Sequence, residues 1–242
     1  KKMPVSIKKY VVLFLLSTFI APVFGQLKSG VITYERKINL LKKYKTEQSR
    51  KWIGDKKVKI DLFELQFTGN ISLFKPIESE SQGKMDWTTS KNTVYQDLNN
   101  NSRLSVYSIW GESVFVRDSA IKREWKITDR KRIIAGYECR RAIWEKNDTT
   151  SIYAWYTNKI NPSTGPETFN GLPGTILGLA TEDGGVVYFA KSIKEAYIDE
   201  DNLEPETKKK EVLSEQELRT KLEKRAKGNP WMKKLVNEVF AW

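Results

Sequence analysis

The stretch from Gly165 to Gly185, GPETFNGLPGTILGLATEDGG, constrains the fold of this 242-residue chain more than any other. It contains six of the fourteen glycines and two of the eight prolines. Proline fixes φ and removes a backbone donor, whereas glycine adopts positive φ at little steric cost, so their order sets the direction of the backbone. Leu172-Pro173-Gly174 has the order of a type II turn. The sequence therefore predicts a tight turn with a fixed backbone path in this stretch, here called the corner.

A β-hairpin is predicted to follow this corner. Thr175-Ile176-Leu177 is a β-prone exit, and Val186-Val187-Tyr188-Phe189 combines β-branched and aromatic residues. Asp183-Gly184-Gly185 lies between them and is a hairpin signal, because glycine supplies the positive φ that tight hairpin turns need.

Upstream of the corner, the chain has the pattern of many short strands separated by polar turns. Residues 57–62 alternate charged and apolar side chains, which is typical of a strand with one buried face. Strands this short and numerous predict a mainly β fold, with an antiparallel sheet that has one apolar and one solvated face. The other candidates are residues 30–35, 65–67, 71–74, 93–98, 103–107, 114–116, 125–127, 137–144 and 152–157.

The C-terminal region, about 214–242, is predicted to be a helical tail. Ser214-Glu215-Gln216-Glu217 is a capping box, Leu218 and Leu222 share one helical face, and Gly228 ends the helix. A second amphipathic segment begins at Trp231. A helix with only two leucines on its apolar face is not stable by itself in water, so we expect the tail to dock on the sheet. Residues 196–210 before it are polar and predict a solvated linker or an extended edge strand.

Residues 1–25 are predicted to be a secretory signal peptide. Lys8-Lys9 precede an apolar stretch from Tyr10 to Ile20, and small residues in 21–25 suit cleavage before Gln26. The stretch is short for a membrane span, which needs about 20 apolar residues. No cysteine follows it that could carry a lipid anchor. We therefore expect a periplasmic or secreted protein with no transmembrane span after cleavage, and a single β-rich domain over residues 26–242.

Charge and composition exclude several function classes. The net charge is +12, and +8 without residues 1–25, but the basic residues are not gathered in a nucleic-acid-binding motif. The chain has no histidine, so catalytic triads and dyads that need imidazole, and histidine-ligated zinc, are excluded. Cys139 is the single cysteine and cannot form an intramolecular disulfide; we interpret it as a buried small hydrophobe in preference to a reactive thiol. No cofactor, metal site or nucleic-acid partner is predicted.

Aromatic residues are frequent, and several alternate with charged residues along the predicted strands. Such side chains either fill a core or line a ligand cavity, and we favour the filled core. The residues expected near the core or a concavity are Trp125, Ile127, Tyr137, Cys139, Trp144, Tyr153, Trp155 and Tyr188.

The corner and the strand before it resemble the GLPGLI family of secreted proteins from Gram-negative bacteria. The resemblance extends from about Gly30 to Asn229-Pro230, and Thr175 stands where the family has leucine. The family has no assigned activity, so the resemblance implies an exported location and an architecture. The residues that carry it are Gly136-Tyr137-Glu138-Cys139, Ala142, Trp155-Tyr156-Thr157, Gly165-Pro166, Phe169, Gly171-Leu172-Pro173-Gly174 and Ile176.

Part of this motif could form a binding site. The functional interpretation is a recognition loop presented to a partner; the structural one, which we favour, is a chain reversal that sets the curvature of the sheet. The candidate binding residues are Trp155, Tyr156, Gly165, Pro166, Phe169, Gly171, Leu172, Pro173 and Gly174.

Two functions fit these observations. The first is an exported, non-catalytic envelope protein that binds a hydrophobic ligand or an outer-membrane partner, accessory to a receptor of a nutrient-uptake system. Its layout is similar to the lipoprotein-carrier half-barrels, in which a helix packs on a curved sheet. The alternative is a hydrolase of envelope or dietary polymer that uses carboxylates. Glu167, Glu182 and Asp183 lie near the corner, and we predict that they are turn and surface carboxylates.

Overall fold

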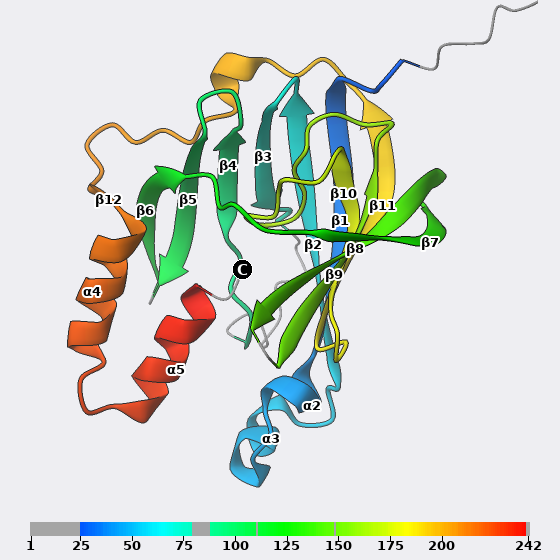
Figure 1. Cartoon of the computed structure of the whole chain (residues 1–242). Coiled ribbons are helices and arrows are strands. Elements are labelled where there is room, and N and C mark those ends of the chain that lie inside the picture. Colours follow the sequence, from blue (N-terminus) through cyan, green and yellow to red (C-terminus); the bar gives the residue numbers. More distant parts are fainter. Residues whose placement is uncertain (1–24, 79–87, 110, 148, 241–242) are drawn as a thin grey trace, which may run out of the picture.

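The computed structural model describes residues 25–78, 88–109, 111–147 and 149–240. The predicted signal peptide therefore lies outside the described residues, except for Gly25. Twelve strands form one sheet in the order β12-β6-β5-β4-β3-β2-β1-β11-β10-β9-β8-β7 (Figure 1). Their bounds are β1 Ser29–Asn39, β2 Val58–Thr68, β3 Ile71–Pro76, β4 Thr93–Asp97, β5 Ser102–Ile109, β6 Glu112–Ser119, β7 Lys126–Ile134, β8 Tyr137–Asn147, β9 Thr150–Thr157, β10 Thr175–Thr181, β11 Val186–Glu195 and β12 Val212–Leu213.

The sheet consists of two antiparallel meanders that meet at β1 and β11, and of the short edge strand β12, which pairs in parallel with β6. Strands β1 to β6 are neighbours in chain order, and so are β7 to β11. The two halves join where β1 pairs with β11. Gly30 allows the strands to approach there, because a Cβ on it would lie 2.4 Å from the carbonyl oxygen of Lys194. The edge strands β12 and β7 do not pair with each other, so the sheet is open.

The predicted mainly β fold is confirmed, with differences in detail. Each predicted strand overlaps an observed one, but residues 57–62 and 65–67 belong to the single strand β2. The predicted hairpin between β10 and β11 is present. Two short helices were not predicted, α2 (Leu40–Lys43) and α3 (Glu47–Ile53). Both start at local caps, where the side chains of Asn39 and Thr46 accept backbone hydrogen bonds, in a segment without clear apolar periodicity.

The main core lies on one face of the sheet, here called the inner face, and it is filled by aromatic rings. Phe63 and Phe74 stack with ring centroids 4.9 Å apart, and Tyr34 and Tyr188 pack on Phe74 edge to face. All four side chains are buried. The filled core that the sequence favoured is therefore present on this face.

The positions of the eight residues expected near the core differ. Cys139 and Tyr188 are buried, and Trp125, Tyr137, Trp144 and Trp155 are partly buried against the main core. Ile127 is 42% exposed, which corrects its prediction. The Tyr153 side chain is also partly exposed, and its hydroxyl donates to Glu182 Oε1 at 2.8 Å. Ile127 is exposed because it lies on the edge strand β7, which is exposed or partly exposed up to Ile133. Tyr153 is on the same face of β9 as Trp155, but it does not pack against the main core.

The buried tyrosines lead to a prediction at alkaline pH. Burial raises the pKa of Tyr34 and of Tyr188 well above the ordinary value, and nearby Cys139 and Glu167, respectively, add to this. The folded protein keeps these hydroxyls protonated, while the unfolded chain loses their protons near pH 10. The two tyrosines should therefore make their full contribution to the free energy of unfolding below about pH 10. Above that pH, the free energy of unfolding should fall by about 1.4 kcal/mol per pH unit and per tyrosine.

Urea titrations along an alkaline pH series measure this fall. Tyr34→Phe should reduce its slope by about one proton, and Tyr197→Phe, at a position 90% exposed, should leave the slope unchanged. An equal slope in the Tyr34→Phe variant and the unmodified protein would contradict the prediction.

The C-terminal region forms two helices, α4 (Glu215–Arg225) and α5 (Pro230–Val239). The predicted capping box at Ser214 and Glu217 is confirmed, since both reciprocal hydrogen bonds are present. Leu218 and Leu222 pack with Val116 on the β5–β6 side of the sheet, beside the edge and not over the aromatic core (Figure 1). The prediction of a docked helical tail is therefore confirmed only in part.

The linker before α4 contains one short 3-10 turn, Glu200–Asn202, within the predicted 196–210 range. Among the helices of the described residues, none has the length and apolar character needed to cross a membrane.

Candidate functional site

The segment between β9 and β10, residues 158–174, crosses the inner face of the sheet; we call it the corner segment (Figure 1). Residues 164–170 within it are all buried. Asn170 Nδ2 donates to Gln96 Oε1 on β4 at 2.8 Å, and Gln96 Nε2 donates to the Glu167 carbonyl oxygen at 3.4 Å. The chain itself therefore occupies the concavity in which the sequence allowed a ligand.

The side chains of Arg123, Trp125 and Trp144 also contact the corner segment. Arg123 Nη1 and Nη2 donate to the carbonyl and hydroxyl oxygens of Thr168, both at 2.7 Å. The Arg123 guanidinium lies 4.2 Å from the ring centroid of Phe169 and 5.0 Å from that of Trp144. Trp125 Nε1 donates to the Asn170 carbonyl oxygen at 2.9 Å. This cluster anchors the segment through its backbone, with Phe169 at the centre.

The structure gives the candidate binding residues two kinds of environment. Gly171 and Pro173 are exposed, and Trp155 is partly exposed below Arg132, whose guanidinium lies 5.1 Å from the Trp155 ring. Gly171, Pro173 and Trp155 therefore do not form a single binding site together with the other candidate residues. The remaining candidates are buried: Tyr156, Gly165, Pro166, Phe169, Leu172 and Gly174.

The Leu172-Pro173-Gly174 turn is tighter than predicted. Gly174 N donates to the Leu172 carbonyl oxygen at 2.7 Å, which closes a three-residue turn in place of the predicted type II turn. Gly174 has φ +136°, and a Cβ on it would lie 2.0 Å from the Thr157 carbonyl oxygen. Glycine is required here because the turn presses directly against the end of β9.

Thr175, where the resembled family has leucine, makes contacts that leucine could not. Its side chain is fully buried, and Oγ1 lies 2.6 Å from the Pro162 carbonyl oxygen and 3.1 Å from that of Ile160. The hydroxyl has one proton and therefore donates to one carbonyl at a time. The Thr175 hydroxyl therefore links the start of β10 to the corner segment.

We expect Thr175→Val to lower the free energy of unfolding by about 1–2 kcal/mol, because a buried hydrogen bond is lost at nearly constant volume. Thermal denaturation measures this. Thr149→Val, at an exposed position, is the control and should change stability by less than about 0.5 kcal/mol. Equal stabilities of the Thr175→Val variant and the unmodified protein would show that the hydroxyl does not hold the corner.

Glu167 is buried, which corrects the prediction of a surface carboxylate. The residue is 1% exposed and adopts a positive φ of 55°. Tyr188 Oη donates to Oε1 at 2.7 Å, and Asn92 Nδ2 donates to Oε2 at 3.3 Å. Arg36 Nη1 lies 3.7 Å from Oε1. These partners come from β11, from the segment before β4 and from β1, so local sequence around Glu167 contains no sign of them.

Arg36 is the centre of the polar cluster and was not predicted as a site residue. Its Nη2 donates to Asp61 Oδ2 at 2.8 Å, and its Nη1 donates to the Ser90 carbonyl oxygen at 2.8 Å. Thr89 Oγ1 also donates to Asp61 Oδ2, at 3.1 Å. The Arg36 Nε is buried and has no hydrogen-bond partner among the described residues. The sequence signal was a charged residue at an inward-facing position of the alternating strand β1.

The two carboxylates beside Arg36 have opposite pKa shifts. Burial raises the pKa of Glu167, although Arg36 and the hydrogen bonds from Tyr188 and Asn92 oppose this. Burial would also raise the pKa of Asp61, but the charge and hydrogen bond of Arg36, with Lys59 and Thr89, lower it overall. The pKa of Arg36 is raised: burial lowers it, but the electrostatic interactions with Tyr188, Glu167 and Asp61 and the hydrogen bond to Asp61 outweigh burial. Asp61 and Arg36 are therefore a fixed ion pair, and Glu167 is the carboxyl with the more weakly held charge.

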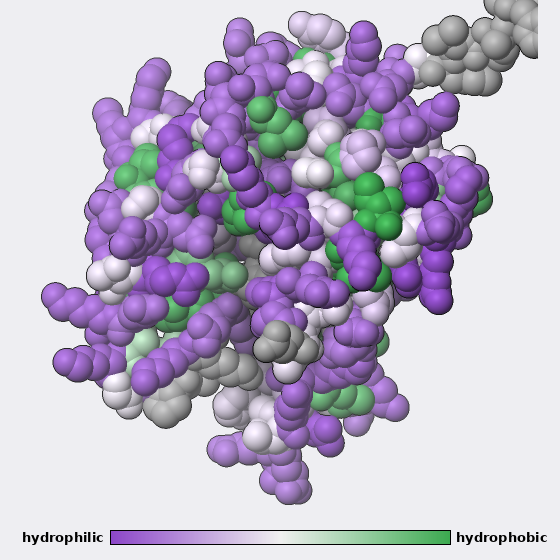
Figure 2. Space-filling view, viewed as in Figure 1, coloured by the Kyte–Doolittle hydropathy of each residue, from purple (hydrophilic) through white to green (hydrophobic). Residues whose placement is uncertain are grey.

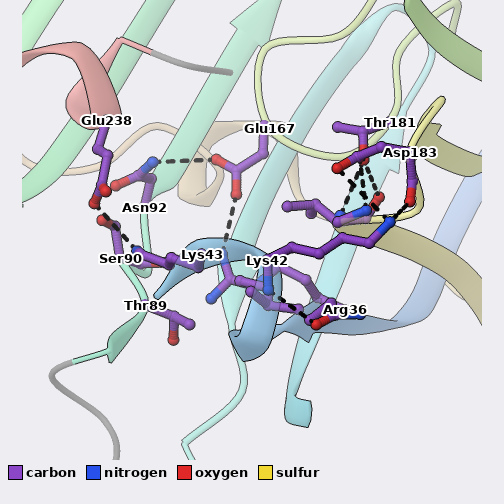
Figure 3. Close-up of a pocket in the computed structure, with 14 residues that line it drawn as sticks. Arg36, Lys42, Lys43, Thr89, Ser90, Asn92, Glu167, Thr181, Asp183 and Glu238 are labelled. Carbon is purple, nitrogen blue, oxygen red and sulfur yellow. Dashed lines mark hydrogen bonds and ion pairs between the residues drawn. The ribbon is translucent and has the colours of Figure 1, made fainter. Parts of the chain in front are cut away.

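A pocket of about 270 Å³ opens beside this cluster, and Lys42 and Lys43 of α2 contribute to its lining (Figure 3). Arg36 and Glu167 line it on one side. The Lys42 side chain extends across it toward Asp183, with Nζ 3.8 Å from Oδ2, and also donates to the Asp183 carbonyl oxygen. Lys43 Nζ lies 3.1 Å from Glu238 Oε2 at another part of the rim. The pocket therefore has one buried and two rim ion pairs.

The structure brings two of the three carboxylates that the sequence grouped near the corner to the pocket and places the third, Glu182, away from it. Glu167 and Asp183 both line the pocket. Asp183 is exposed, as predicted, and its pKa is lowered by hydrogen bonds from Thr181 and the Gly185 backbone, with Lys42 contributing. Glu182 is exposed and accepts from Tyr153, so it faces away from the pocket.

Other chemistry is limited in the part of the chain that the structure describes. No group of three or more histidine, cysteine, aspartate or glutamate side chains there could hold a metal ion. Burial raises the pKa of the Cys139 thiol to about 12, so it is an inert hydrophobe, as predicted. The face of the molecule seen in Figure 2 is mostly hydrophilic, with small separate hydrophobic patches.

Comparisons with known proteins give a family match over part of the chain. A family model described as a protein of unknown function (Porph_ging) matches residues 144–178, which include the end of β8, β9 and the corner segment. No curated protein matches the sequence.

Two solved structures of PNGF-II share the fold of this chain at low sequence identity. A structure of PNGF-II in a C2 crystal form has a TM-score of 0.54 at 19% identity, over 80% of this chain, and a P21 form has 0.53 at 18% identity. The chain spans 32% of the length of PNGF-II. An uncharacterized conserved protein from Thermus thermophilus has a TM-score of 0.42 at 6% identity, over 86% of this chain and 99% of that one. The PNGF-II likeness describes the fold of the sheet.

Proposed function

We propose that this chain is an exported, non-catalytic binding protein of the cell envelope, and that it binds a small polar ligand in the pocket beside Arg36 and Glu167. The observation that carries the proposal is the buried Arg36–Glu167 pair at the wall of an open pocket. Buried charged groups are costly unless they are fully paired, and convergent polar groups in a pocket are typical of ligand sites. Export rests on the sequence of residues 1–25.

The inner face is less suited to the hydrophobic ligand that the sequence suggested. Aromatic rings and the corner segment fill it, and an acyl chain would have to displace residues 164–170 with their hydrogen bonds. A polar ligand in the pocket needs no such rearrangement. An outer-membrane partner, and a place beside a nutrient-uptake receptor, remain proposals that rest on the sequence.

Native mass spectrometry of the protein purified gently from the envelope tests the binding function. We expect a small molecule to be retained at one per chain. Ser90→Trp, at an exposed residue that lines the pocket, should release it, whereas Ser113→Trp, at an exposed residue of β6, should not.

A fluorescent fatty acid is the second arm of this test. Saturable binding of the fatty acid that Ser90→Trp does not change would favour the hydrophobic ligand instead. The absence of any retained molecule and of fatty-acid binding would reject the binding function.

A second candidate is a carboxylate-dependent hydrolase of envelope or dietary polymer. The observation in its favour is that Glu167 and Asp183 line one pocket with pKa values shifted in opposite directions, as in enzymes that use one carboxyl as acid and another as base. Both carboxylates already have protein partners, so we place this function second.

Incubation with peptidoglycan and plant polysaccharides across a pH series, followed by detection of new reducing ends, distinguishes the two functions. A hydrolase should lose at least about 100-fold in rate in both Glu167→Gln and Asp183→Asn. Activity that survives both substitutions, or the absence of activity on all the polymers, would remove this candidate.

A further inference from the structure

Several hydrogen-bond acceptors that line the pocket are already engaged within the protein. Both carboxylate oxygens of Glu167 already accept hydrogen bonds, and the Ser90 carbonyl oxygen accepts from Arg36. Asn39 Oδ1 accepts from the Lys42 backbone, and Thr181 Oγ1 donates to Asp183 Oδ1. These acceptors therefore have partners within the protein.

The donors are less completely engaged. Arg36 is 4% exposed, and its Nε has no partner among the described residues, although a buried donor without one is costly. A guanidinium matches the geometry of carboxylate and phosphate groups. Each rim lysine has a partner, but a partly exposed one: the Asp183 side chain is 63% exposed, and Glu238 is 32% exposed. Exposed ion pairs of this kind contribute little and exchange easily.

We propose that the ligand of this pocket is a small free anion that carries a carboxylate or phosphate group, held by Lys42 and Lys43 at the rim and by Arg36 inside. This inference rests on the proposed binding function and names its ligand class. The anion would replace Asp183 and Glu238 as the partner of the two lysines and supply an acceptor for Arg36 Nε, which has none among the described residues. The volume of about 270 Å³ limits the ligand to the size of a small metabolite.

Isothermal titration calorimetry with matched probes tests the inference. Succinate and glycerol 3-phosphate supply the two anionic groups, and 1,4-butanediol and glycerol are their uncharged counterparts. We expect one-site binding of at least one anion and none of the uncharged probes. Lys42→Met/Lys43→Met should weaken anion binding about tenfold or more, because charge-assisted hydrogen bonds are lost, and Lys43→Arg should retain it.

Lys191→Met is the matched control. Lys191 also pairs with one carboxylate, Glu35, and its side chain is 57% exposed, but it does not line the pocket. It should leave anion binding unchanged. All of these lysines are partly exposed, so we expect the variants to fold, and their circular dichroism spectra and melting temperatures check this.

Four outcomes would overturn the inference. Binding of the uncharged probes equal to that of the anions would show a ligand class other than an anion, while the binding function would stand. Anion binding that the rim variants leave unchanged would place the anion elsewhere. Absence of binding for all four probes would also reject the anion as the ligand class. The binding function is tested separately, by whether a molecule is retained in native mass spectrometry. Cosedimentation with phosphatidylglycerol vesicles but not phosphatidylcholine vesicles, without binding of the free anions, would assign the site to a lipid headgroup.

Discussion

Replacing Gly174 by alanine should prevent the chain from folding or destabilise it by more than about 3 kcal/mol, although it adds one methyl group. The added Cβ would lie 2.0 Å from the Thr157 carbonyl oxygen and 2.8 Å from the Asn158 Cα. These are backbone atoms, so no side-chain rotation relieves the overlap, and the φ of +136° is unfavourable for any residue with a Cβ. The start of β10 would have to move away from the end of β9.

Chemical denaturation, or the soluble yield where the variant does not fold, measures this effect. Gly184→Ala is the matched control, because Gly184 also has positive φ, +66°, but nothing lies within 4 Å of its Cβ position. It should cost about 1 kcal/mol. A folded Gly174→Ala protein of near-normal stability would show that the corner is not a fixed part of the scaffold. If such a protein had also lost a partner, the recognition interpretation of the corner would gain support.

Arg36→Met should destabilise the protein by about 3–5 kcal/mol at neutral pH, because the buried Glu167 would lose its cation. Asp61 would keep Lys59 and Lys91, whose Nζ atoms lie 3.3 Å and 3.9 Å from its Oδ1, but it would lose its closest ion pair. Arg36 Nη2 is 2.8 Å from Asp61 Oδ2, and both side chains are almost fully buried. Lys191→Met removes one lysine from a partly exposed ion pair with Glu35 and should cost less than about 1 kcal/mol. Urea denaturation of both variants measures the difference.

The pH dependence of the Arg36→Met effect separates charge from packing. Without Arg36, the pKa of Glu167 should rise further, and that of Asp61 should rise although Lys59 and Thr89 still oppose it, so Glu167 above all can be buried in its neutral form at acidic pH. The loss of stability relative to the unmodified protein should therefore be largest at neutral pH and shrink as the pH falls toward about 4. The same loss at all pH values would show that Arg36 acts through its contact with the Phe63 ring, 4.6 Å away, and not through its charge.

Local sequence predicted most of the strands but not the way they are ordered in the sheet. The alternation in residues 57–62 predicted β2, and the turn Asp183-Gly184-Gly185 predicted the β10–β11 hairpin. Both patterns involve only residues that are neighbours in the chain. The pairing of β1 with β11 joins residues more than 140 positions apart. No local pattern contains that pairing, because it depends on which strand edges remain free after the hairpins form.

The candidate site shows the same division. Sequence reasoning named Glu167 and Asp183 but predicted that both lie at the surface, and it did not name Arg36. The side chains that bury Glu167 come from Tyr188 on β11 and Asn92 before β4. A carboxylate in a Gly-Pro turn is ordinarily solvated, and only the path of the corner segment across the inner face places this one against Arg36.

A mainly β fold, the approximate positions of the strands and of the C-terminal helices, and the exclusion of histidine chemistry could be inferred from the sequence alone. These properties follow from alternation, turn residues, caps and composition, which act over a few positions. The filling of the inner face by the chain's own corner segment and the polar pocket beside Arg36 became evident only in the folded structure. Burial and ion pairing depend on residues far apart in the chain, and their energies are determined when those residues meet.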